Sequence, residues 1–206
     1  MPTLLQIDSS GRGTTSVTRP LTSYCAAQWK ANNYHAKVVY RDLLTSELPF
    51  VNEEIVGAYY TPQDQQTAHQ KNVLVKSDQL IDELLAADCF VFGVPMYNFS
   101  VPAVFKAYID LTVRAGKTFS FEGGMPKGLL IDKTAIFISS SGGDYSAGPM
   151  KAMDFVEPYV RAIFGFIGVK SIQFLTVPGR DPATLAAGSA RAQEQMDKIL
   201  QVAARV

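Results

Sequence analysis

The sequence has few of the side chains that form metal sites or covalent catalytic centres. Its 206 residues include two cysteines, Cys25 and Cys89, and two histidines, His35 and His69. The cysteines are far apart, and Cys89 stands in an apolar run that is typical of a protein core. Both histidines lie in or beside segments that we expect at the surface, and no G-x-S-x-G motif occurs. Proteolysis, esterase chemistry and zinc catalysis are therefore not expected, and the sequence predicts no metal site.

An excess of charge of one sign is also missing. Lys and Arg total 19, Asp and Glu total 19, and the formal net charge is zero. A nucleic-acid-binding protein normally presents a basic face, and an electron carrier that docks on protein partners is often strongly acidic. We therefore expect no nucleic-acid partner, and a substrate that is small and uncharged or is carried by a cofactor.

Long hydrophobic runs are absent as well. No segment approaches the length needed to span a bilayer, and the chain opens on an apolar strand pattern rather than on a basic segment followed by an apolar one. With 47% hydrophobic and 18% charged residues, the composition is that of a globular protein and not of a disordered chain. We expect a cytoplasmic protein with no membrane partner.

Short apolar runs alternate with longer helical patterns along the whole chain. The runs predicted as strands are Thr3–Asp8, Lys37–Tyr40, Asp88–Val94, Thr134–Ser139 and Val169–Val177. Helices are expected over residues 16–31, 73–86, from Pro102 onward, 150–164 and 182–204. This alternation is typical of βαβ units on a parallel sheet. We predict one domain over residues 1–206, an α/β, flavodoxin-like, doubly wound fold with five parallel strands in the order 2-1-3-4-5 and helices on both faces.

Two longer stretches, residues 44–61 and 116–133, show no regular pattern and are rich in aromatic side chains. The rings are Phe50, Tyr59 and Tyr60 in the first stretch and Phe119 and Phe121 in the second. Loops of this length in a compact domain are usually functional or part of an interface. The rings either form contacts with another molecule or cover the ends of the core, and the sequence leaves both interpretations open.

In a parallel sheet of this kind, ligands bind beyond the carboxyl ends of the strands. After the first predicted strand, six of the ten residues from Ser9 to Thr18 are Ser or Thr, and a helix follows. A phosphate group would meet backbone N–H groups, hydroxyl donors and the positive end of the helix dipole there. Alternatively, the loop is merely solvated, with Ser16 as an ordinary helix N-cap.

The same loop does not complete a dinucleotide-binding fingerprint. After Gly11-Arg-Gly13, the position of the third glycine holds Ser16. We also expect no acidic residue to close the second strand at the required distance.

The segments after the third and fourth predicted strands have suitable side chains for an aromatic ring system. Pro95-Met-Tyr-Asn-Phe99 offers main-chain groups for a ring edge and flat or soft side chains for a ring face. Ser139-Ser-Ser-Gly-Gly143 offers hydroxyl donors and a close backbone approach. Each segment alone could be a hydrophobic turn or a flexible loop. Together with the first loop they favour a cofactor that supplies the chemistry itself.

Four motifs then point to a known family. They are Pro95-Met-Tyr-Asn-Phe99, Arg114-Ala-Gly116 with Thr118-Phe119, Ser140–Gly143 with Gly148-Pro149, and Gly165-Phe-Ile-Gly168. In this order they resemble the bacterial FMN-dependent NADH azoreductases of the flavodoxin-like quinone reductase superfamily, and the resemblance covers essentially the whole chain.

The resemblance implies a set of cofactor and substrate residues. Those that would hold the FMN phosphate and ribityl chain are Ser10, Ser16, Val17 and Thr18. Those that would line the isoalloxazine or contact its edge are Met96, Tyr97, Asn98, Phe99, Ser140, Ser141, Gly142 and Gly143. Those assigned to the acceptor are Phe119, Phe121 and Tyr145.

The resemblance also implies a mechanism and an assembly. NADH or NADPH would deliver hydride to flavin N5 and leave, and an azo compound or quinone would then enter and be reduced. Members are homodimers with active sites at the subunit interface. The chain departs from the family where Ser141 replaces a bulky or basic residue and Phe121 replaces a Tyr, and both changes bear on the preferred acceptor.

Several alternatives stay open at this level. The chain could be an electron-carrier flavodoxin, although its balanced charge counts against that, or an FMN-binding regulatory protein without turnover. Quinones could be the physiological acceptors and azo dyes incidental ones. The preference between NADH and NADPH is also open, because the candidate cations for a 2′-phosphate are scattered in sequence: Arg12, Lys117, Lys127 and Arg180.

Overall fold

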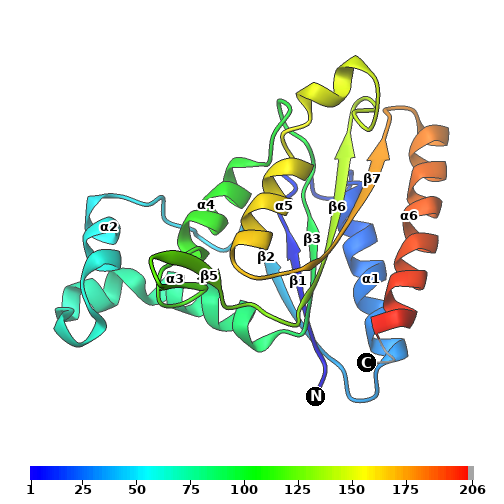
Figure 1. The fold of residues 1–206 in the computed structure, drawn as a ribbon. Helices are drawn as coiled ribbons and strands as arrows, with labels where there is room; N and C mark the ends of the chain where they lie inside the picture. The colour runs from blue at the N-terminus through cyan, green and yellow to red at the C-terminus, as the bar shows by residue number, and fades with distance from the viewer. Residues whose placement is uncertain (204–206) are drawn as a thin grey trace.

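A five-stranded parallel sheet forms the centre of the molecule (Figure 1). The computed structural model describes residues 1–203, so the end of the predicted last helix at Ala204 lies outside the described residues. The sheet order is β2-β1-β3-β6-β7. The strands are β1 (Thr3–Asp8), β2 (Lys37–Asp42), β3 (Cys89–Gly93), β6 (Thr134–Ser141) and β7 (Ser171–Pro178). Because β6 and β7 are the fourth and fifth strands of this sheet along the chain, the predicted 2-1-3-4-5 order is confirmed.

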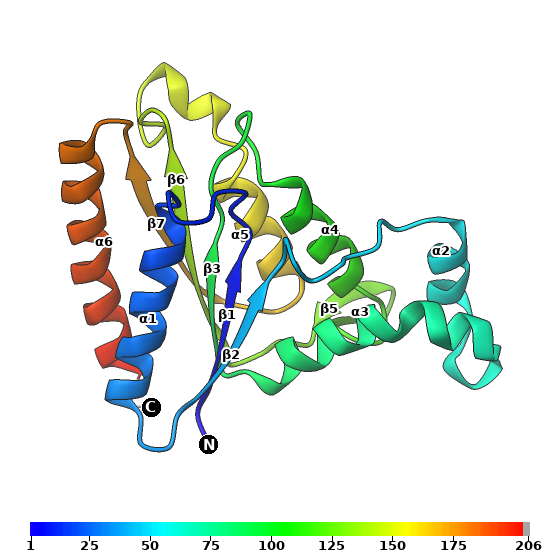
Figure 2. The same cartoon turned by 180° about the vertical axis from the view of Figure 1, so that it is seen from behind.

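Helices cover both faces of this sheet, as Figures 1 and 2 show. One face is covered by α1 (Thr18–Asn32) and α6 (Pro182–Ala203), and the other by α3 (Ala68–Ala86), α4 (Ala103–Thr112) and α5 (Glu157–Phe166). The helix α1 buries Leu21, Cys25 and Trp29 at a spacing of four residues, which forms one apolar stripe. The described part of the chain contains no helix with the length and apolar character of a membrane span.

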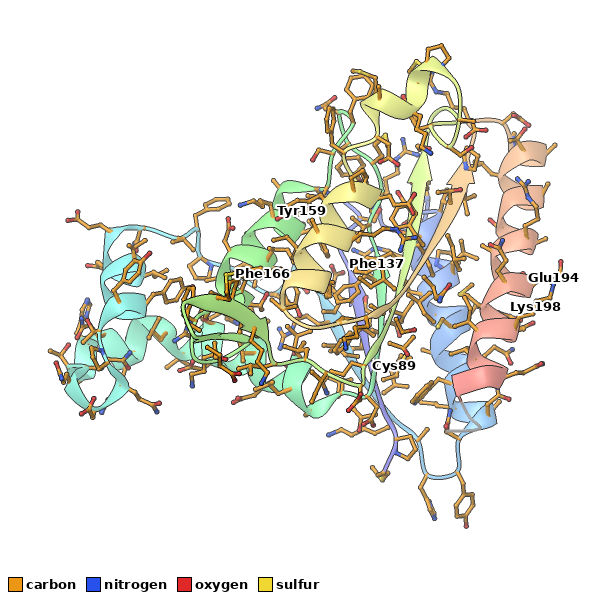
Figure 3. All side chains as sticks on the ribbon, in the orientation of Figure 1. Cys89, Phe137, Tyr159, Phe166, Glu194 and Lys198 are labelled. Atoms are coloured by element: carbon orange, nitrogen blue, oxygen red, sulfur yellow. The ribbon has the colours of Figure 1, made fainter. Side chains whose placement is uncertain are left out.

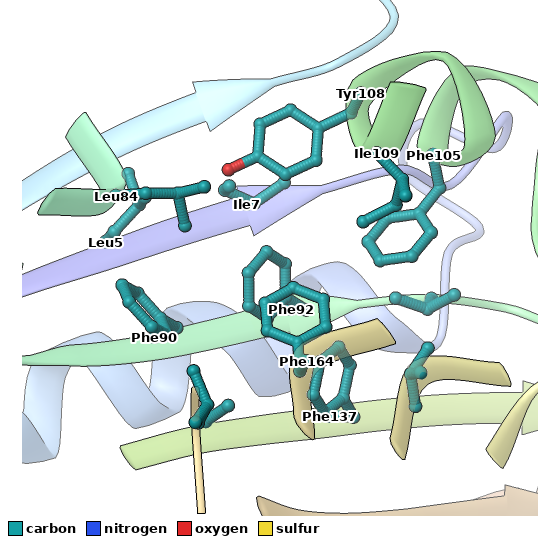
Figure 4. Close-up of a cluster of buried hydrophobic side chains, with 14 of the residues drawn as sticks. Leu5, Ile7, Leu84, Phe90, Phe92, Phe105, Tyr108, Ile109, Phe137 and Phe164 are labelled. Atoms are coloured by element: carbon teal, nitrogen blue, oxygen red, sulfur yellow. The ribbon is translucent and has the colours of Figure 1, made fainter. Parts of the chain in front are cut away.

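The core is aromatic and centres on β3. All five residues of this strand are buried, as a central parallel strand requires, because both of its faces are covered by helices. The ring of Phe92 stacks on Phe137 with centroids 4.9 Å apart and planes 9° apart, and Phe164 meets both rings edge-on (Figure 4). This cluster stiffens the strands whose carboxyl ends carry the candidate site.

Both cysteines lie in the core, as predicted for Cys89. Burial raises the pKa of the Cys25 thiol to about 12 and raises that of Cys89 as well. Cys89 opens β3 at the amino end of the strand (Figure 3), which is the edge opposite to the candidate site. Neither thiol is therefore suited to act as a nucleophile.

The helix predicted over residues 150–164 is wrong in its bounds. A short 3-10 helix, η2 (Pro149–Met153), is followed by a break, and α5 begins only at Glu157. Asp154 Oδ1 accepts the N–H groups of Val156 and Glu157 at 2.8 and 3.2 Å, which starts the helix anew. Pro158 fits only in the first turn of a helix, because it has no N–H to donate.

Both stretches predicted as irregular contain regular elements. The first holds α2 (Glu53–Tyr60), whose N-cap Asn52 accepts the Ile55 N–H at 3.0 Å, and the 3-10 helix η1 (Gln63–Gln65) follows it. The second holds an antiparallel hairpin of β4 (Phe119–Glu122) and β5 (Met125–Gly128). Its turn, Gly123-Gly124, has positive φ at both residues, and this is the signal that could have predicted the hairpin.

Candidate cofactor-binding site

The loops after β1, β3 and β6 meet at the carboxyl edge of the sheet, at the top of Figure 2. Together with the residues after β7 they enclose a cavity of about 520 Å³. Seven of the predicted cofactor residues line it: Ser10, Val17, Met96, Tyr97, Ser140, Ser141 and Gly142. The remaining lining residues are Arg12, Pro95, Gly179, Arg180 and Leu185.

The loop after β1 presents a cluster of hydrogen-bond donors to this cavity. Among residues 1–203, the N–H groups of Val17 and Thr18 at the start of α1 have no acceptor. The helix begins at Thr18 rather than at the predicted Ser16, but the Ser16 hydroxyl still accepts the Arg19 N–H at 3.3 Å. Free N–H groups at a helix N-terminus attract an anion, because they carry the positive end of the dipole.

Two hydroxyl groups extend this donor cluster. The Gly11 N–H donates to the Tyr97 hydroxyl at 2.9 Å, and the Arg12 N–H donates to the Ser10 hydroxyl at 3.2 Å. Each hydroxyl accepts from the main chain and so keeps its own proton available for a ligand. Tyr97 was predicted as a wall for the flavin ring, and the structure shows that it also holds the first loop.

The loop after β3 is a tight turn. Asn98 and Phe99 have φ values of 49° and 70°, which non-glycine residues rarely adopt. The turn is closed by two main-chain hydrogen bonds between Tyr97 and Ser100, at 2.9 and 3.1 Å. It places Asn98 and Phe99 on the exposed rim and not among the lining residues, with the Phe99 ring centroid 6.0 Å from that of Tyr145.

The loop after β6 is held to its neighbours on both sides. The Met96 N–H donates to the Ser140 carbonyl at 2.8 Å, and the Gly179 N–H donates to the Ser141 carbonyl at 2.9 Å. A Cβ atom on Gly142 would lie 2.7 Å from Nε of Arg180, so the guanidinium packs closely against this glycine. Gly143, although predicted, does not line the cavity.

Two cations that are scattered in the sequence meet at this cavity. Arg12 comes from the loop after β1 and Arg180 follows β7, and both line it. From the sequence, Arg180 is only one of four scattered cations, and its place at this cavity is not predicted. The signal that could have found it is its position directly after the last parallel strand, because all parallel strands end at the same edge.

An ion pair lies behind the first loop. The strand β2 extends to Asp42, beyond the predicted Tyr40, and so ends in an acidic residue. Both Asp42 oxygens accept hydrogen bonds from Arg19, at 2.7 and 2.9 Å, so this carboxylate is not free for a ribose hydroxyl. Burial alone would raise the pKa of Asp42, but the hydrogen bonds from Arg19 and from the Leu44 N–H outweigh it and lower the pKa.

The floor beneath the first loop is tightly packed. A Cβ atom on Gly93 would lie 2.8 Å from Asp8 Oδ1 and 3.1 Å from Thr18 Oγ1, so β3 must end in glycine here. Thr18 is fully buried in this floor, with its hydroxyl 3.4 Å from that of Ser16. Burial raises the pKa of Asp8, and hydrogen bonding by Thr22 and the charge of Arg19 oppose this shift.

Of the predicted acceptor residues, none lines the 520 Å³ cavity. Tyr145 lies nearby, against Phe99. Phe119 and Phe121 belong to the β4–β5 hairpin, where Phe119 packs on Phe166 of α5 with ring centroids 4.7 Å apart. Within one chain the hairpin lies away from the loop edge (Figure 1).

The residues present fit a flavin mononucleotide. The cavity is within the range of about 300–1,000 Å³ that is usual for small-molecule sites. One end offers N–H and hydroxyl donors for a phosphate, and the other offers Met96, Tyr97 and main-chain groups for a flat ring. In the same residues 1–203 no group of three or more His, Cys, Asp or Glu side chains has the arrangement of a metal site.

Comparison with known proteins identifies the family. Residues 2–200 match the family model described as flavodoxin-like fold. FMN-dependent NADH:quinone oxidoreductase 1 of Hahella chejuensis is 45% identical over 204 residues, which is 98% of this chain and 96% of the relative. The corresponding enzyme of Nostoc punctiforme is 43% identical over 94% of this chain and 92% of the relative. The crystal structure of azoreductase from Bacillus anthracis str. Sterne is 28% identical, with a TM-score of 0.88 over 97% of this chain and 99% of that one. The chain therefore belongs to the flavodoxin-like family and, within it, to the FMN-dependent NADH:quinone oxidoreductases and azoreductases that its motifs resemble.

Proposed function

We propose that this protein is an FMN-dependent NAD(P)H oxidoreductase that reduces quinones and azo compounds in the cytoplasm. The observation that carries the proposal is the cavity at the carboxyl edge of the sheet, which joins a cluster of anion-binding donors to an apolar wall. The names of the relatives supply the cofactor, the donor and the two classes of acceptor. The balanced charge of the chain argues against an electron carrier.

The chain's residues bind and orient the cofactor. The N–H groups of Val17 and Thr18 and the hydroxyl of Ser10 bind the phosphate, and Ser16 supports them by accepting the Arg19 N–H. This anchor fixes one end of the cofactor and thereby the position of the ring at the other end.

Residues of the second and third loops would hold the ring. Met96 and Tyr97 would form its wall, and the main chain of Asn98 and Phe99, on the exposed rim, would face its polar edge. The residues that would contact its remaining edge are Ser140, Ser141 and Gly142. Bound FMN would supply the redox chemistry, which is the two-step transfer of hydride from the nicotinamide to the acceptor through the flavin N5.

The acceptor site is completed by a second subunit. Tyr145 lies beside Phe99 in the same chain, at 6.0 Å between ring centroids. Phe119 and Phe121 reach an active site only from a partner, because they lie away from the cavity of their own chain. The exposed Phe121 ring, with 64% of its surface accessible, is consistent with a homodimer whose active sites lie at the interface.

The test is a visible absorption spectrum of the purified protein, reconstituted with FMN and then mixed anaerobically with NADH. We expect a protein-bound flavin spectrum that bleaches quickly with NADH and returns when a quinone is added. Free FMN at the same concentration serves as the control, and NADPH replaces NADH in a parallel sample.

Two results would contradict the proposal in different ways. A protein that binds no FMN would refute the assignment of the cavity. A bound flavin that neither NADH nor NADPH reduces would favour a carrier or a regulatory protein instead.

A further inference from the structure

Arg19, in the first turn of α1, donates hydrogen bonds to several groups outside its own helix. The proposed function assigns no role to this side chain. We propose that Arg19 is a positioning residue for the cofactor phosphate. It holds the loop after β1 from behind, so that hydrogen-bond donors and not carbonyl oxygens face the phosphate. This inference rests on the proposed function, since it presupposes that FMN binds at this loop.

The guanidinium of Arg19 is fully engaged by the protein. Its five N–H groups meet five acceptors. Two are main-chain carbonyls of the loop, Ser10 at 2.9 Å and Arg12 at 3.0 Å. The others are the two oxygens of Asp42, at 2.7 and 2.9 Å, and the hydroxyl of Tyr40, at 3.2 Å. No donor remains for a ligand, so Arg19 acts through the loop and does not bind the phosphate itself.

These contacts determine which way the loop peptides point. With the Ser10 and Arg12 carbonyls bound to Arg19, their partial negative charges are turned away from the cavity. The neighbouring N–H groups of Gly11 and Arg12 point to the hydroxyls of Tyr97 and Ser10, which line the cavity. A carbonyl oxygen turned toward a phosphate would repel it, so this orientation favours the anion.

Arg19 also neutralises the carboxylates behind the loop. Its Nη1 lies 2.7 Å from Asp42 and 3.8 Å from the fully buried Asp8. Without the guanidinium, Asp42 and Asp8 would lie behind the loop with no positive charge to offset their repulsion of the doubly charged cofactor phosphate. Arg19 therefore supports phosphate binding by geometry and by charge, and neither effect extends to the distant ring.

The test compares FMN with riboflavin, which has the same ring and no phosphate. Apoprotein is titrated with each flavin, and the dissociation constants are measured from the quenching of flavin fluorescence. The Arg19→Lys variant keeps the charge but loses the planar fork of donors. We expect its dissociation constant for FMN to rise about tenfold, because hydrogen bonds to a charged group are lost, while that for riboflavin changes less than about twofold.

Arg41 provides a matched control. It lies one residue before Asp42 on the same strand and is paired with Glu83, with Nε 2.7 Å from Oε2. Its side-chain exposure of 12% is close to the 17% of Arg19, but its other hydrogen bond is to Ser46 and not to the loop after β1. We expect Arg41→Lys to leave the ratio of the two dissociation constants unchanged.

A second variant covers the case in which Arg19→Lys does not fold. Asp42→Asn removes the charge that orients the guanidinium and preserves Arg19 itself. We expect it to raise the dissociation constant for FMN about threefold, again with little effect on riboflavin. Thermal melting of each apoprotein shows whether it is folded.

The outcomes separate this inference from the proposed function. Wild-type protein that binds neither flavin overturns both. Wild-type protein that binds FMN, with Arg19 variants whose affinities for FMN and riboflavin fall equally, overturns the inference alone, because Arg19 is then only structural. A selective loss of FMN affinity in the Arg19 and Asp42 variants, absent in Arg41→Lys, supports it.

Discussion

Asp8 is a carboxyl group enclosed at the end of β1, with 1% of its surface exposed. Its Oδ1 accepts a hydrogen bond from the Thr22 hydroxyl at 2.8 Å, and Arg19 lies 3.8 Å away. Burial nevertheless dominates and raises its pKa above the ordinary value of 3.8. The folded protein therefore holds this proton more tightly than the unfolded chain does. The stability that protonated Asp8 contributes is present at low pH and is lost as the pH rises through the folded pKa.

The Asp8→Asn variant tests this sign. Asparagine has a similar shape and does not ionise, so it avoids the cost of a buried charge at higher pH. We expect the free energy of unfolding of the apo variant, relative to that of wild type, to increase as the pH rises from about 4 to about 7. Urea denaturation at several pH values measures it. Carboxylates that lie away from Asp8 and Arg19 titrate alike in both proteins and cancel in the difference. A difference that falls with rising pH would contradict the assignment.

At the scale of elements, the β4–β5 hairpin is joined to the end of α5 through bare backbone. A Cβ atom on Gly128 would lie 2.2 Å from the Gly168 nitrogen, and the Leu130 N–H donates to the Ile167 carbonyl at 2.9 Å. Gly168 itself has a φ of 108°, which side chains rarely adopt. The hairpin can lie here only because neither glycine carries a side chain.

Two glycine substitutions test this contact. We expect Gly128→Ala to lower the free energy of unfolding by about 3 kcal/mol, because the new methyl group forces the two segments apart. Gly165→Ala, in α5, is the matched control, since an added Cβ meets nothing within 4 Å. It should be neutral or stabilise the protein by up to about 1 kcal/mol. Urea denaturation of both variants measures their free energies of unfolding. Equal changes in the two variants would show that the contact between Gly128 and Gly168 does not limit stability.

At the scale of the whole molecule, the aromatic side chains of the two long stretches divide into two groups. Tyr59 covers the core, with its ring 4.7 Å from the Arg114 guanidinium, and Phe119 packs on Phe166. Phe50, Tyr60 and Phe121 instead expose 76%, 86% and 64% of their surface. The interpretation that rings cover the core is therefore confirmed for Tyr59 and Phe119, and contact with another molecule stays a prediction for the exposed rings.

The exposed group leads to a prediction about assembly. We expect wild-type protein to sediment as a homodimer. We expect Phe121→Glu to raise the dimer dissociation constant at least about tenfold, because the substitution puts a charge where the dimer would bury an aromatic ring. NADH:quinone activity should fall in parallel. Tyr34→Glu is the control, because Tyr34 is 86% exposed but follows α1, which covers the other face of the sheet from α5 and the hairpin. Sedimentation velocity that finds a wild-type monomer, or an unchanged Phe121→Glu dimer, would refute the interface.

The sequence by itself determined the layers of the fold and the edge of the sheet at which the candidate cavity lies. Apolar runs such as Cys89–Gly93 predict buried parallel strands, because both faces of a central strand must avoid water. Once the strands are known to be parallel, their carboxyl ends share one edge, and the loops containing Ser10, Met96 and Ser140 are expected to meet. Errors arose where short local signals decide an element, as at Asn52, which caps α2, and at Asp154, which restarts α5.

Only the tertiary structure decided how the site is supported. Arg19 reaches Asp42 on another strand, the Tyr97 hydroxyl holds Gly11 across 86 residues of sequence, and Arg12 and Arg180 meet at one cavity. Periodicity in a sequence records which face of an element is buried, and that is set by neighbours three or four residues away. It carries no information on which polar side chain meets which carbonyl across the fold. Those contacts depend on the register and packing of whole elements, and so they are defined only after the chain has folded.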